Sequence, residues 1–477
     1  MADLSVDVAI IGAGTAGMAA YREVIKYTRS VALLDGGPLG TTCARVGCMP
    51  SKLLIAPAEA RHRTESWAQF GLRGPMPNVD GKAVMTRVRA ERDRFVGFVL
   101  EAVDGFDPAH VIRENAIFID DHTLKLSGGR TLHTDQVVIA VGSRPIIPPP
   151  FEAAGDRLIL NDDVFEWDDL PESVAVFGAG VIGLELAQAL HRLGVRVRLF
   201  GRGGLVGPLT DPAVRDYALK TFAAEYPFLA DGDTQIRRDG DQVVVAFNDG
   251  EAREERFDYL LAATGRRSNI DQLGVDKTSV ELTERGAPIY DRMSGRCGGT
   301  NIFIAGDATV DLPLLHEAAD EGRIAGENAA RWPNVYKRAR RTPLGVVFSD
   351  PQIAMAGKTY RELETSHDIG FAIGEVSFED QGRARVMLEN KGLLRVYGEE
   401  GTGLFLGFEM IGADAEHIAH LLAWALESRL TVGELLLRPF YHPVVEEGVR
   451  TAFRELHKAL GMGPQPPNRC IDCGPGG

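Results

Sequence analysis

Apolar runs and helical patterns follow one another along the chain, and one such arrangement occurs twice. Residues 6–11 and 174–177 are apolar runs of the length typical of buried strands. Each run leads into a glycine turn and then into a helical pattern. Both turns have the spacing Gly-x-Gly-x-x-Gly, at residues 12–17 and 178–183, so the second copy lies 178 − 12 = 166 positions after the first. The sequence therefore predicts two copies of one strand–turn–helix unit.

Each glycine of the repeated turn has a role in binding a dinucleotide. The first permits the tight turn, the second lets the backbone approach a pyrophosphate, and the third lets the helix pack closely on the strand. A single turn of this spacing occurs by chance, but a duplicated one between strand and helix indicates two nucleotide sites. The glycines are Gly12, Gly14 and Gly17 in the first copy and Gly178, Gly180 and Gly183 in the second.

The residue that follows the next strand distinguishes the two sites. In the first copy the apolar run 31–34 is followed by Asp35, whose carboxylate can accept hydrogen bonds from the free ribose hydroxyls of FAD or NAD. The equivalent position of the second copy is Gly201, and the next residue is Arg202, which could pair with a 2′-phosphate. Arg202 therefore favours NADP(H) over NAD(H). The alternative is that Arg202 is an ordinary solvated surface arginine.

Composition and charge narrow the partners and the compartment. The 477 residues contain 52 Lys and Arg against 67 Asp and Glu, so the net charge is −15, and the chain has no basic run. This balance argues against nucleic acid or an anionic membrane as the main partner, and no apolar run approaches the ~20 residues of a membrane span. The chain enters a strand almost at once without a basic leader, so we expect a cytoplasmic protein. There, close cysteine pairs are more typical of catalysis, redox chemistry or metal binding than of structural bridges.

Cys43 and Cys48 form such a pair, just before a helical pattern over residues 53–67. Five residues of ideal helix rise about 7.5 Å, beyond the roughly 7 Å Cα separation of a disulfide, so a bridge needs a distorted turn. Pro50 provides a reason for distortion, because it lacks an N–H and crowds the carbonyl of Val46. The positive end of the helix also favours a thiolate. The alternatives are two reduced, buried cysteines or half of a zinc site, although no neighbouring His or Cys completes a metal set.

The segment Cys43-x4-Cys48-Met49-Pro50-Ser51-Lys52, placed after a dinucleotide turn, resembles the redox motif of the flavoprotein disulfide reductases. This family includes dihydrolipoamide dehydrogenase, glutathione reductase, mercuric reductase and the large thioredoxin reductases. Further segments resemble the family's motifs in the same order, closest to the dihydrolipoamide dehydrogenase branch. They are residues 140–145 at the exit from the first FAD segment, 263–267 at the exit from the nicotinamide domain, 301–307 in the second FAD motif, 315–319 under the flavin and 347–351 at the start of the interface domain.

The resemblance implies an α/β fold with two Rossmann-like dinucleotide-binding domains, for FAD and NAD(P), and a C-terminal α+β dimerisation domain. In the family's motifs, Asp307 would hold the ribityl chain of FAD. The other cofactor-binding residues implied by these motifs are Gly142, Gly265, Gly306, Leu315 and His316. The expected ranges are 1–148 and 271–340 for the FAD domain, 149–270 for the NAD(P) domain, 341–460 for the dimerisation domain and 461–477 for a flexible tail.

Near the C-terminus, residues 439–447 resemble the family's His-Pro-x-x-x-Glu motif. The resemblance implies that His442 is the acid/base of thiol–disulfide exchange and that Glu447 orients its imidazole. It also pairs Lys52 with Glu185 beside the flavin. Because the family builds each active site from the cysteines of one chain and the histidine of the other, it implies an obligate homodimer.

The implied function is that of an FAD-dependent dithiol/disulfide oxidoreductase. Hydride would pass between NAD(P)H and FAD and electrons between FAD and the cysteine pair, with Cys48 facing the flavin and Cys43 exchanging with substrate. The reaction direction stays open, as does the choice among lipoamide, a small disulfide, a protein disulfide and a metal ion. A rival from another class is a flavoprotein NAD(P)H oxidase or transhydrogenase, which would not need Cys43. A non-enzymatic rival is a dimeric scaffold formed through residues 341–460.

Some residues depart from the family pattern or are left over from it. Thr41 stands where many members have Gly, and Arg45 stands where many have Asn; Arg45 either adds a charge close to the reactive sulfur or is a surface residue. Cys470 and Cys473 in the tail are either a relay, as in an NADPH-driven disulfide or mercuric-type reductase, or part of an inert or metal-scavenging tail. We expect Cys297 to be an ordinary packed residue without a cysteine partner.

Overall fold

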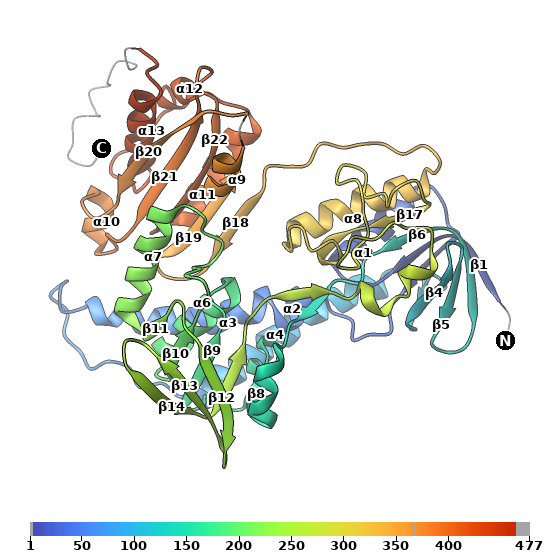
Figure 1. Cartoon of the computed structure of the whole chain (residues 1–477), viewed down its shortest axis with the longest axis horizontal. Coiled ribbons are helices and arrows are strands. Elements are labelled where there is room, and N and C mark those ends of the chain that lie inside the picture. The colour runs from blue at the N-terminus through green and yellow to red at the C-terminus, as the bar shows by residue number, and fades with distance from the viewer. Residues whose placement is uncertain (1–2, 367, 464–477) are drawn as a thin grey trace.

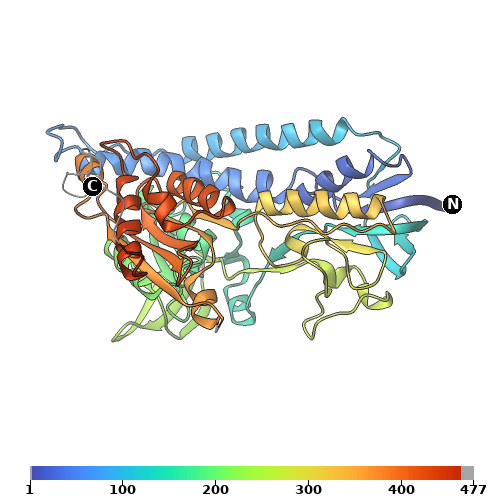
Figure 2. The same ribbon diagram turned by 90° about the horizontal axis from the view of Figure 1, so that it is seen from above.

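The computed structural model describes residues 3–366 and 368–463, and the described strands form five sheets. Figure 1 shows an elongated molecule with a mixed sheet near the N-terminus and the C-terminal sheet at the opposite end, above a second, parallel sheet. Helices α3 (Cys48–His62) and α4 (Gly81–Asp104) pack together and run lengthwise along one side (Figure 2). They connect the regions of the two nucleotide-type sheets.

The first sheet is built around the apolar run at the N-terminus. β1 (Leu4–Ile11) pairs in parallel with β2 (Val31–Leu34) and β6 (Thr131–Ile139). Val8 and Ile10 face the core under α1 (Thr15–Val24) and α8 (Leu315–Ala330), whereas Ala9 and Ile11 face a second core on the other side. A parallel strand buried on both faces is apolar, which is why the second half of β1, Val8 to Ile11, is continuously apolar. The remaining strands are β3 (Val111–Ile112), β4 (Ala116–Asp120), β5 (Thr123–Leu126) and β17 (Ile302–Ile304).

The second nucleotide-type sheet repeats this construction and is parallel throughout. β9 (Ser173–Phe177) is buried along its whole length between its two parallel neighbours. A separate antiparallel sheet of three strands packs its apolar residues into one of the cores of this domain. The parallel strands are β8 (Leu158–Ile159), β9, β10 (Arg196–Phe200), β11 (Phe228–Leu229) and β15 (Tyr259–Ala262); the antiparallel ones are β12 (Thr234–Asp239), β13 (Gln242–Asn248) and β14 (Ala252–Phe257). The short pair β7 (Ser143–Pro145) and β16 (Arg266–Ser268) lies in the two connections between the nucleotide-type sheets.

The C-terminal sheet is antiparallel, yet it is buried on both faces. Along β22 (Phe405–Gly412), Phe408 and Met410 enter the core formed with α11, α12 and α13, whereas Ile411 enters the core of the second nucleotide-type domain. Helix α7 of that domain stands against the sheet (Figure 1). The strands are β18 (Leu344–Val347), β19 (Gln352–Gly357), β20 (Phe371–Ser377), β21 (Leu393–Glu399) and β22.

Helices complete these layers. The 3-10 segments are Arg63–Ser66, Pro149–Arg157, Ile270–Gln272, Val275–Lys277 and Gly306–Ala308. The α-helices other than α3 and α4 are α1 (Thr15–Val24), α2 (Thr42–Val46), α5 (Asn161–Val164), α6 (Val181–Arg192), α7 (Pro212–Glu225), α8 (Leu315–Ala330), α9 (Tyr360–Thr365), α10 (Gly382–Met387), α11 (Ala415–Glu427), α12 (Val432–Leu436) and α13 (Glu447–Ala459). The predicted fold class, two Rossmann-like domains with a C-terminal α+β domain, is confirmed.

The helix expected over residues 53–67 is α3, but its predicted limits are wrong at both ends. It begins at Cys48 and its α-helical part ends at His62. Pro50 does not delay the start of the helix, because a proline is tolerated in the first turn, where its missing N–H has no intrahelical acceptor.

Helices α1 and α8 approach so closely that only glycine fits at two positions of α8. A Cβ on Gly322 would lie 2.2 Å from the Ala16 carbonyl oxygen, and one on Gly326 would lie 2.5 Å from that of Ala20. Because α8 follows β17 and α1 follows β1, this contact joins the two separated parts of the first domain.

We expect Gly326→Ala to destabilise the protein, because its Cβ would meet backbone; overpacking of this kind costs roughly 1–3 kcal/mol. Gly97→Ala is the matched control, since Gly97 also lies inside a helix but has open space at its Cβ. In Gly97→Ala the gain in helix propensity, about 1 kcal/mol, should leave the melting temperature unchanged or higher. Thermal unfolding followed by circular dichroism measures both variants, and equal melting temperatures would contradict the close-approach argument.

Candidate active site

The two cysteines lie on either side of a break between two helices. α2 ends at Val46, Gly47 leaves helical geometry at φ −125° and ψ −115°, and α3 begins at Cys48. Pro50 cannot donate to the Val46 carbonyl, and the Asn161 side-chain Nδ2 donates to it instead, at 2.8 Å. The expected distortion is therefore present, but it lies at Gly47. Asn161 was missed by sequence reasoning, because nothing in the sequence links position 161 to the cysteine segment.

The cysteines interact as a thiol and a thiolate. Both are free in the structure, on either side of the Gly47 break. Hydrogen bonding to the Cys43 side chain, assisted by the charge of Lys52 against the opposing effect of burial, lowers the pKa of Cys48 to about 7. The same hydrogen bonding, together with burial, raises the pKa of Cys43 above its ordinary value. Above about pH 7 the negative charge of the pair therefore lies on Cys48, while Cys43 keeps its proton.

Lys52 and Glu185 meet although they lie far apart in the sequence. Lys52 Nζ is 2.8 Å from the Glu185 carboxylate, which is almost fully buried on α6. The backbone N–H of Phe348 donates to the same carboxylate at 3.0 Å, and the ammonium lies 4.5 Å from the centre of the Phe348 ring. The cysteine helix, the second nucleotide-type domain and the start of the C-terminal domain thus converge on one carboxylate.

His442 and Glu447 form a dyad at the start of α13. His442 Nδ1 lies 3.0 Å from both oxygens of the Glu447 carboxylate, which is buried, whereas most of the imidazole is exposed. The backbone N–H of Val444 also donates to this carboxylate, at 3.3 Å. Because the carboxylate holds Nδ1, the ring presents Nε2 to the outside, in the orientation that a proton-transferring histidine needs.

The dyad and the cysteine pair are not brought together within one chain. Figure 1 shows α13 on the C-terminal sheet, well away from α2. Among the described residues, no hydrogen bond or ion pair joins His442 or Glu447 to the cysteine segment. A site that uses both needs a second chain.

The first glycine turn fits the pyrophosphate of a dinucleotide. A Cβ on Gly12 would lie 2.3 Å from the Ala140 carbonyl oxygen and one on Gly17 would lie 1.8 Å from that of Gly12, whereas Gly14 faces open space. Helix α1 begins there without a side-chain cap and without an acidic residue in its first turn. Its free N–H groups and positive end therefore remain available to an anion. Asp35 reaches the turn and accepts the Ala13 N–H at 2.7 Å.

The second glycine turn has the same construction but differs at the ribose end. Helix α6 also begins without a cap or an early acidic residue, behind the open Gly180. The close approaches recur: a Cβ on Gly178 would lie 2.2 Å from the Ala263 carbonyl oxygen, and one on Gly183 would lie 1.7 Å from that of Gly178. At Gly201 a Cβ would lie 2.7 Å from the Ala230 carbonyl oxygen, so a carboxylate side chain does not fit without a backbone shift.

The next loop carries Arg202, whose side chain is exposed. The Gly203 N–H donates to Asp231 at 2.8 Å. The loop thus has one exposed cation and one nearby carboxylate.

Residues 301–307, which resemble the family's second FAD motif, meet the two connections between the nucleotide-type domains. The Ser143 hydroxyl donates to Asp307 Oδ2 at 2.9 Å. The same hydroxyl oxygen accepts a hydrogen bond from Arg266 Nε at 2.9 Å. Leu315 is the first residue of α8, and His316, with an exposed side chain, follows it. Three neighbouring glycines have positive φ: Gly142 at 65°, Gly265 at 109° and Gly306 at 71°.

The structure also places the residues that depart from the family pattern. Thr41 has φ 58°, a region that favours glycine, but its hydroxyl accepts the Ala44 N–H at 3.2 Å and caps α2. The Arg45 side chain is half-buried and lies against Gly40. Cys297 is buried, and burial raises its pKa to about 12. Cys470 and Cys473 lie outside the described residues.

Residues 3–366 and 368–463 contain no group of three or more His, Cys, Asp or Glu side chains arranged to hold a metal ion. No helix among them combines the length and the hydropathy that crossing a bilayer requires.

Comparison with known proteins gives consistent matches along the chain. The family model described as pyridine nucleotide-disulphide oxidoreductase matches residues 6–322, and the model of its dimerisation domain matches residues 344–453. A mercuric reductase of Shigella flexneri is 30% identical over 468 residues, which cover 94% of this chain and 81% of that protein. A dihydrolipoyl dehydrogenase of Geobacillus stearothermophilus is 28% identical and covers 95% and 96%. The crystal structure of LpdA from Mycobacterium tuberculosis matches with a TM-score of 0.79 at 25% identity, over 94% of this chain and 99% of LpdA.

The lowered pKa of Cys48 predicts how its alkylation depends on pH. In the reduced protein, alkylation of Cys48 by iodoacetamide should rise with pH through a midpoint near pH 7, because the thiolate is the nucleophile. Cys43→Ala removes the hydrogen-bond donor and should move this midpoint to higher pH. Peptide mass spectrometry gives the rate at Cys48, with Cys297→Ser as the control. An unchanged midpoint in Cys43→Ala would show that the Cys43 thiol does not stabilise the thiolate.

Proposed function

The chain belongs to the pyridine nucleotide-disulphide oxidoreductases, and from this premise we propose that it uses FAD and NAD(P)(H) to interconvert a dithiol and a disulfide through Cys43 and Cys48. The observation that carries the proposal is the placement of the two cysteines on either side of the Gly47 break, with Lys52, which pairs with Glu185, one helical turn after Cys48. Bound FAD would supply the two-electron transfer between the pyridine nucleotide and sulfur. The two uncapped glycine turns and Asp307 are the groups that would hold the two cofactors.

The cysteines have different tasks in this proposal. Reduction of a Cys43–Cys48 disulfide takes up two electrons and one proton, and leaves a thiolate on Cys48 and a thiol on Cys43. Lys52 stabilises the Cys48 thiolate. The raised pKa of Cys43 means that this thiol needs a base before it can attack a substrate disulfide. His442, held by Glu447, is the base we assign, and it returns the proton to the departing sulfur.

We propose a homodimer in which each site combines the cysteines of one chain with the dyad of the other. Exposed apolar side chains on the domain that carries the dyad support this arrangement. Tyr441, next to His442, is 79% exposed, and Trp424 on α11 is 66% exposed. Leu421 and Leu437 are exposed on the same domain. Large apolar side chains this exposed mark a surface that a partner covers, and the match to a dimerisation domain agrees with it.

Subunit complementation tests the shared site. Cys48→Ser and His442→Gln homodimers should each lose activity, the latter by about 10²- to 10⁴-fold, as expected for a missing acid/base. When both chains are co-expressed, each heterodimer regains one intact site of its two. Random pairing makes about half of the dimers heterodimers, so about a quarter of wild-type activity should return. Co-expressed Cys48→Ser and Cys43→Ser chains, which never form an intact site, are the control. No recovery in the first mixture would rule out a site shared between chains.

For the pyridine nucleotide we propose NADP(H), because Gly201 leaves no room for a ribose-binding carboxylate and Arg202 is exposed beside it. Arg202→Ala should raise KM for NADPH by roughly tenfold, the effect of losing one charge-assisted hydrogen bond, and should leave KM for NADH unchanged. Arg237→Ala, on the outer strand β12, is the charge-matched control. If Arg202→Ala leaves KM unchanged for NADPH as well as for NADH, Arg202 is a solvated surface residue.

For the substrate we propose dihydrolipoamide-type chemistry, with an NADPH-driven disulfide or mercuric-type reductase as the second candidate, since dihydrolipoyl dehydrogenases and mercuric reductases both match along nearly the whole chain. Anaerobic titration of the flavin spectrum with dihydrolipoamide, NADH or NADPH separates them. A long-wavelength thiolate-to-flavin band from dihydrolipoamide, with NAD⁺ reduction, would support the dehydrogenase and would contradict the role proposed for Arg202. The same band from NADPH alone would support the reductase and make Cys470 and Cys473 the next variants.

The same titration tests the rival class. Cys43→Ser should abolish turnover with any disulfide or dithiol. An NAD(P)H oxidase or transhydrogenase would keep its turnover in this variant, and that result, or the absence of the band with every donor, would contradict a dithiol/disulfide function.

A further inference from the structure

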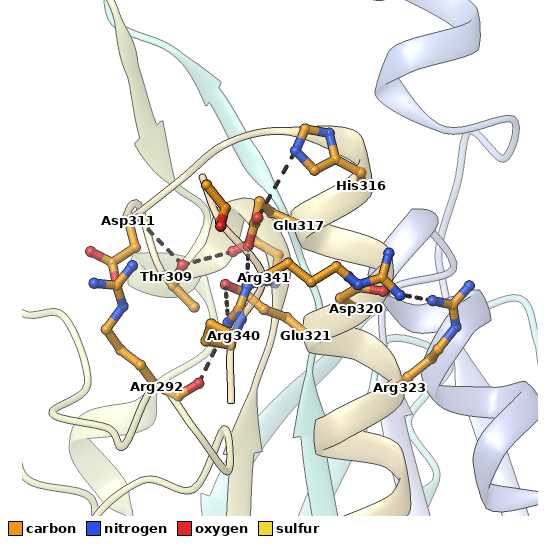
Figure 3. A network of polar contacts seen from close by, with 12 residues as sticks. Arg292, Thr309, Asp311, His316, Glu317, Asp320, Glu321, Arg323, Arg340 and Arg341 are labelled. Carbon is orange, nitrogen blue, oxygen red and sulfur yellow. Dashed lines mark hydrogen bonds and ion pairs between the residues drawn. The ribbon is translucent and has the colours of Figure 1, made fainter. Parts of the chain in front are cut away.

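The linker between α8 and the C-terminal domain lies along α8 and is bound to it by arginines. Arg338 pairs with Glu327 near the end of the helix at 2.6 Å, and Arg341 pairs with Asp320 nearer its start at 3.1 Å. Arg340, between them, contacts both Glu317 and Glu321 (Figure 3). The linker therefore runs antiparallel to α8, with its later residues over the first turns of the helix.

Arg340 differs from the other two arginines because its partners are buried. Its side chain is 16% exposed, against 52% for Arg338 and 71% for Arg341. The side chains of Glu317 and Glu321 are only 3% and 6% exposed. A buried carboxylate without a partner destabilises the fold. Arg340 supplies the positive charge that these two carboxylates need, because they are shielded from solvent.

One of these carboxylates connects Arg340 to the second FAD segment. Glu321 Oε1 lies 2.9 Å from Arg340, and its Oε2 accepts the Gly306 N–H at 2.7 Å. Gly306 directly precedes Asp307, which we assign to the ribityl chain. Burial raises the pKa of Glu321, and the charge of Arg340 opposes this effect.

The other carboxylate lies in the first turn of α8. The helix starts at Leu315 without a side-chain cap, and Glu317 turns its carboxylate to Arg340. The first turn carries the positive end of the helix, which would stabilise negative charge on a group bound in front of it. A free Glu317 carboxylate would cancel that effect, and Arg340 neutralises it.

We propose that Arg340 is a positioning residue for the flavin site: it holds the first turn of α8 in place and cancels the charge of Glu317, and thereby raises the reduction potential of bound FAD. This inference rests on the proposed function, which requires FAD at the start of α8. The linker that carries Arg340 continues into β18, so the C-terminal domain is joined to the flavin site through this residue.

The test is the two-electron midpoint potential of FAD, measured anaerobically against reference dyes in a Cys43→Ser/Cys48→Ser background, so that only the flavin titrates. Arg340→Gln should shift the reduction equilibrium on the order of tenfold toward oxidised FAD, which is about 30 mV for a two-electron couple. Arg338→Gln is the matched control, because it removes the same charge from the same linker and should leave the potential unchanged. Arg340→Lys keeps the charge and should restore most of the wild-type value.

A charge-neutral double variant separates electrostatics from general disruption. Glu317→Gln/Arg340→Gln has the same net charge in this cluster as the wild type, so its potential should return toward the wild-type value. Glu317→Gln alone should raise the potential, and this variant tests the inference even where Arg340→Gln does not fold. An Arg340→Gln potential equal to that of Arg338→Gln, or a double variant no closer to wild type than the single one, would overturn the inference.

The outcomes also distinguish this inference from the proposed function. A wild-type chain that binds no FAD would overturn the proposed function itself. A flavin that binds and reacts normally, but has the same potential in every variant, would overturn the role of Arg340 alone.

Discussion

The buried Glu185 carboxylate is the contact on which the arrangement of the three domains depends. A charge removed from water must be paired, and Glu185 receives its donors from two other parts of the chain, Lys52 of the cysteine helix and the backbone of Phe348. Satisfying this one group places α3 against α6 and places the start of the C-terminal domain beside both. The same contact positions the Lys52 ammonium, whose charge favours the Cys48 thiolate. Domain packing and thiol chemistry thus share one ion pair.

A second buried polar group holds the C-terminal sheet on the second nucleotide-type domain. Residues alternate along β22, so Phe408 and Met410 face the helices of their own domain while Glu409 points to the other side. There Glu409 accepts the N–H groups of Thr210, Asp211 and Tyr360 at 2.6, 2.9 and 2.9 Å. Because these donors belong to both domains, the sheet cannot slide without leaving a buried charge unpaired. The relation between the two domains is therefore fixed by directional bonds as well as by apolar contact.

The functional groups are divided between these rigid parts in a way that makes one chain incomplete. The cysteine pair lies at the junction of the nucleotide-type domains, and the His442–Glu447 dyad lies on the far sheet, with its imidazole open to the outside. The dyad is preorganised before any partner arrives, since Glu447 already holds Nδ1. In the proposed dimer, a second chain has only to place Nε2, and the exposed Tyr441 next to His442 provides apolar surface for that contact.

The sequence by itself determined the local features of this protein: the two glycine turns, the buried strands before them, the cysteine motif, the family and the fold class. These follow from residue type and spacing, because a strand buried on both faces must be apolar and a turn at a pyrophosphate must lack Cβ atoms. Tertiary structure decided which distant groups satisfy one another. Asn161 on the Val46 carbonyl and Phe348 on Glu185 join segments 115 and 163 positions apart, and Arg340 on Glu317 ties the linker back to the helix before it. No local pattern encodes such pairs, because a buried polar atom needs a partner but does not specify where in the sequence that partner lies.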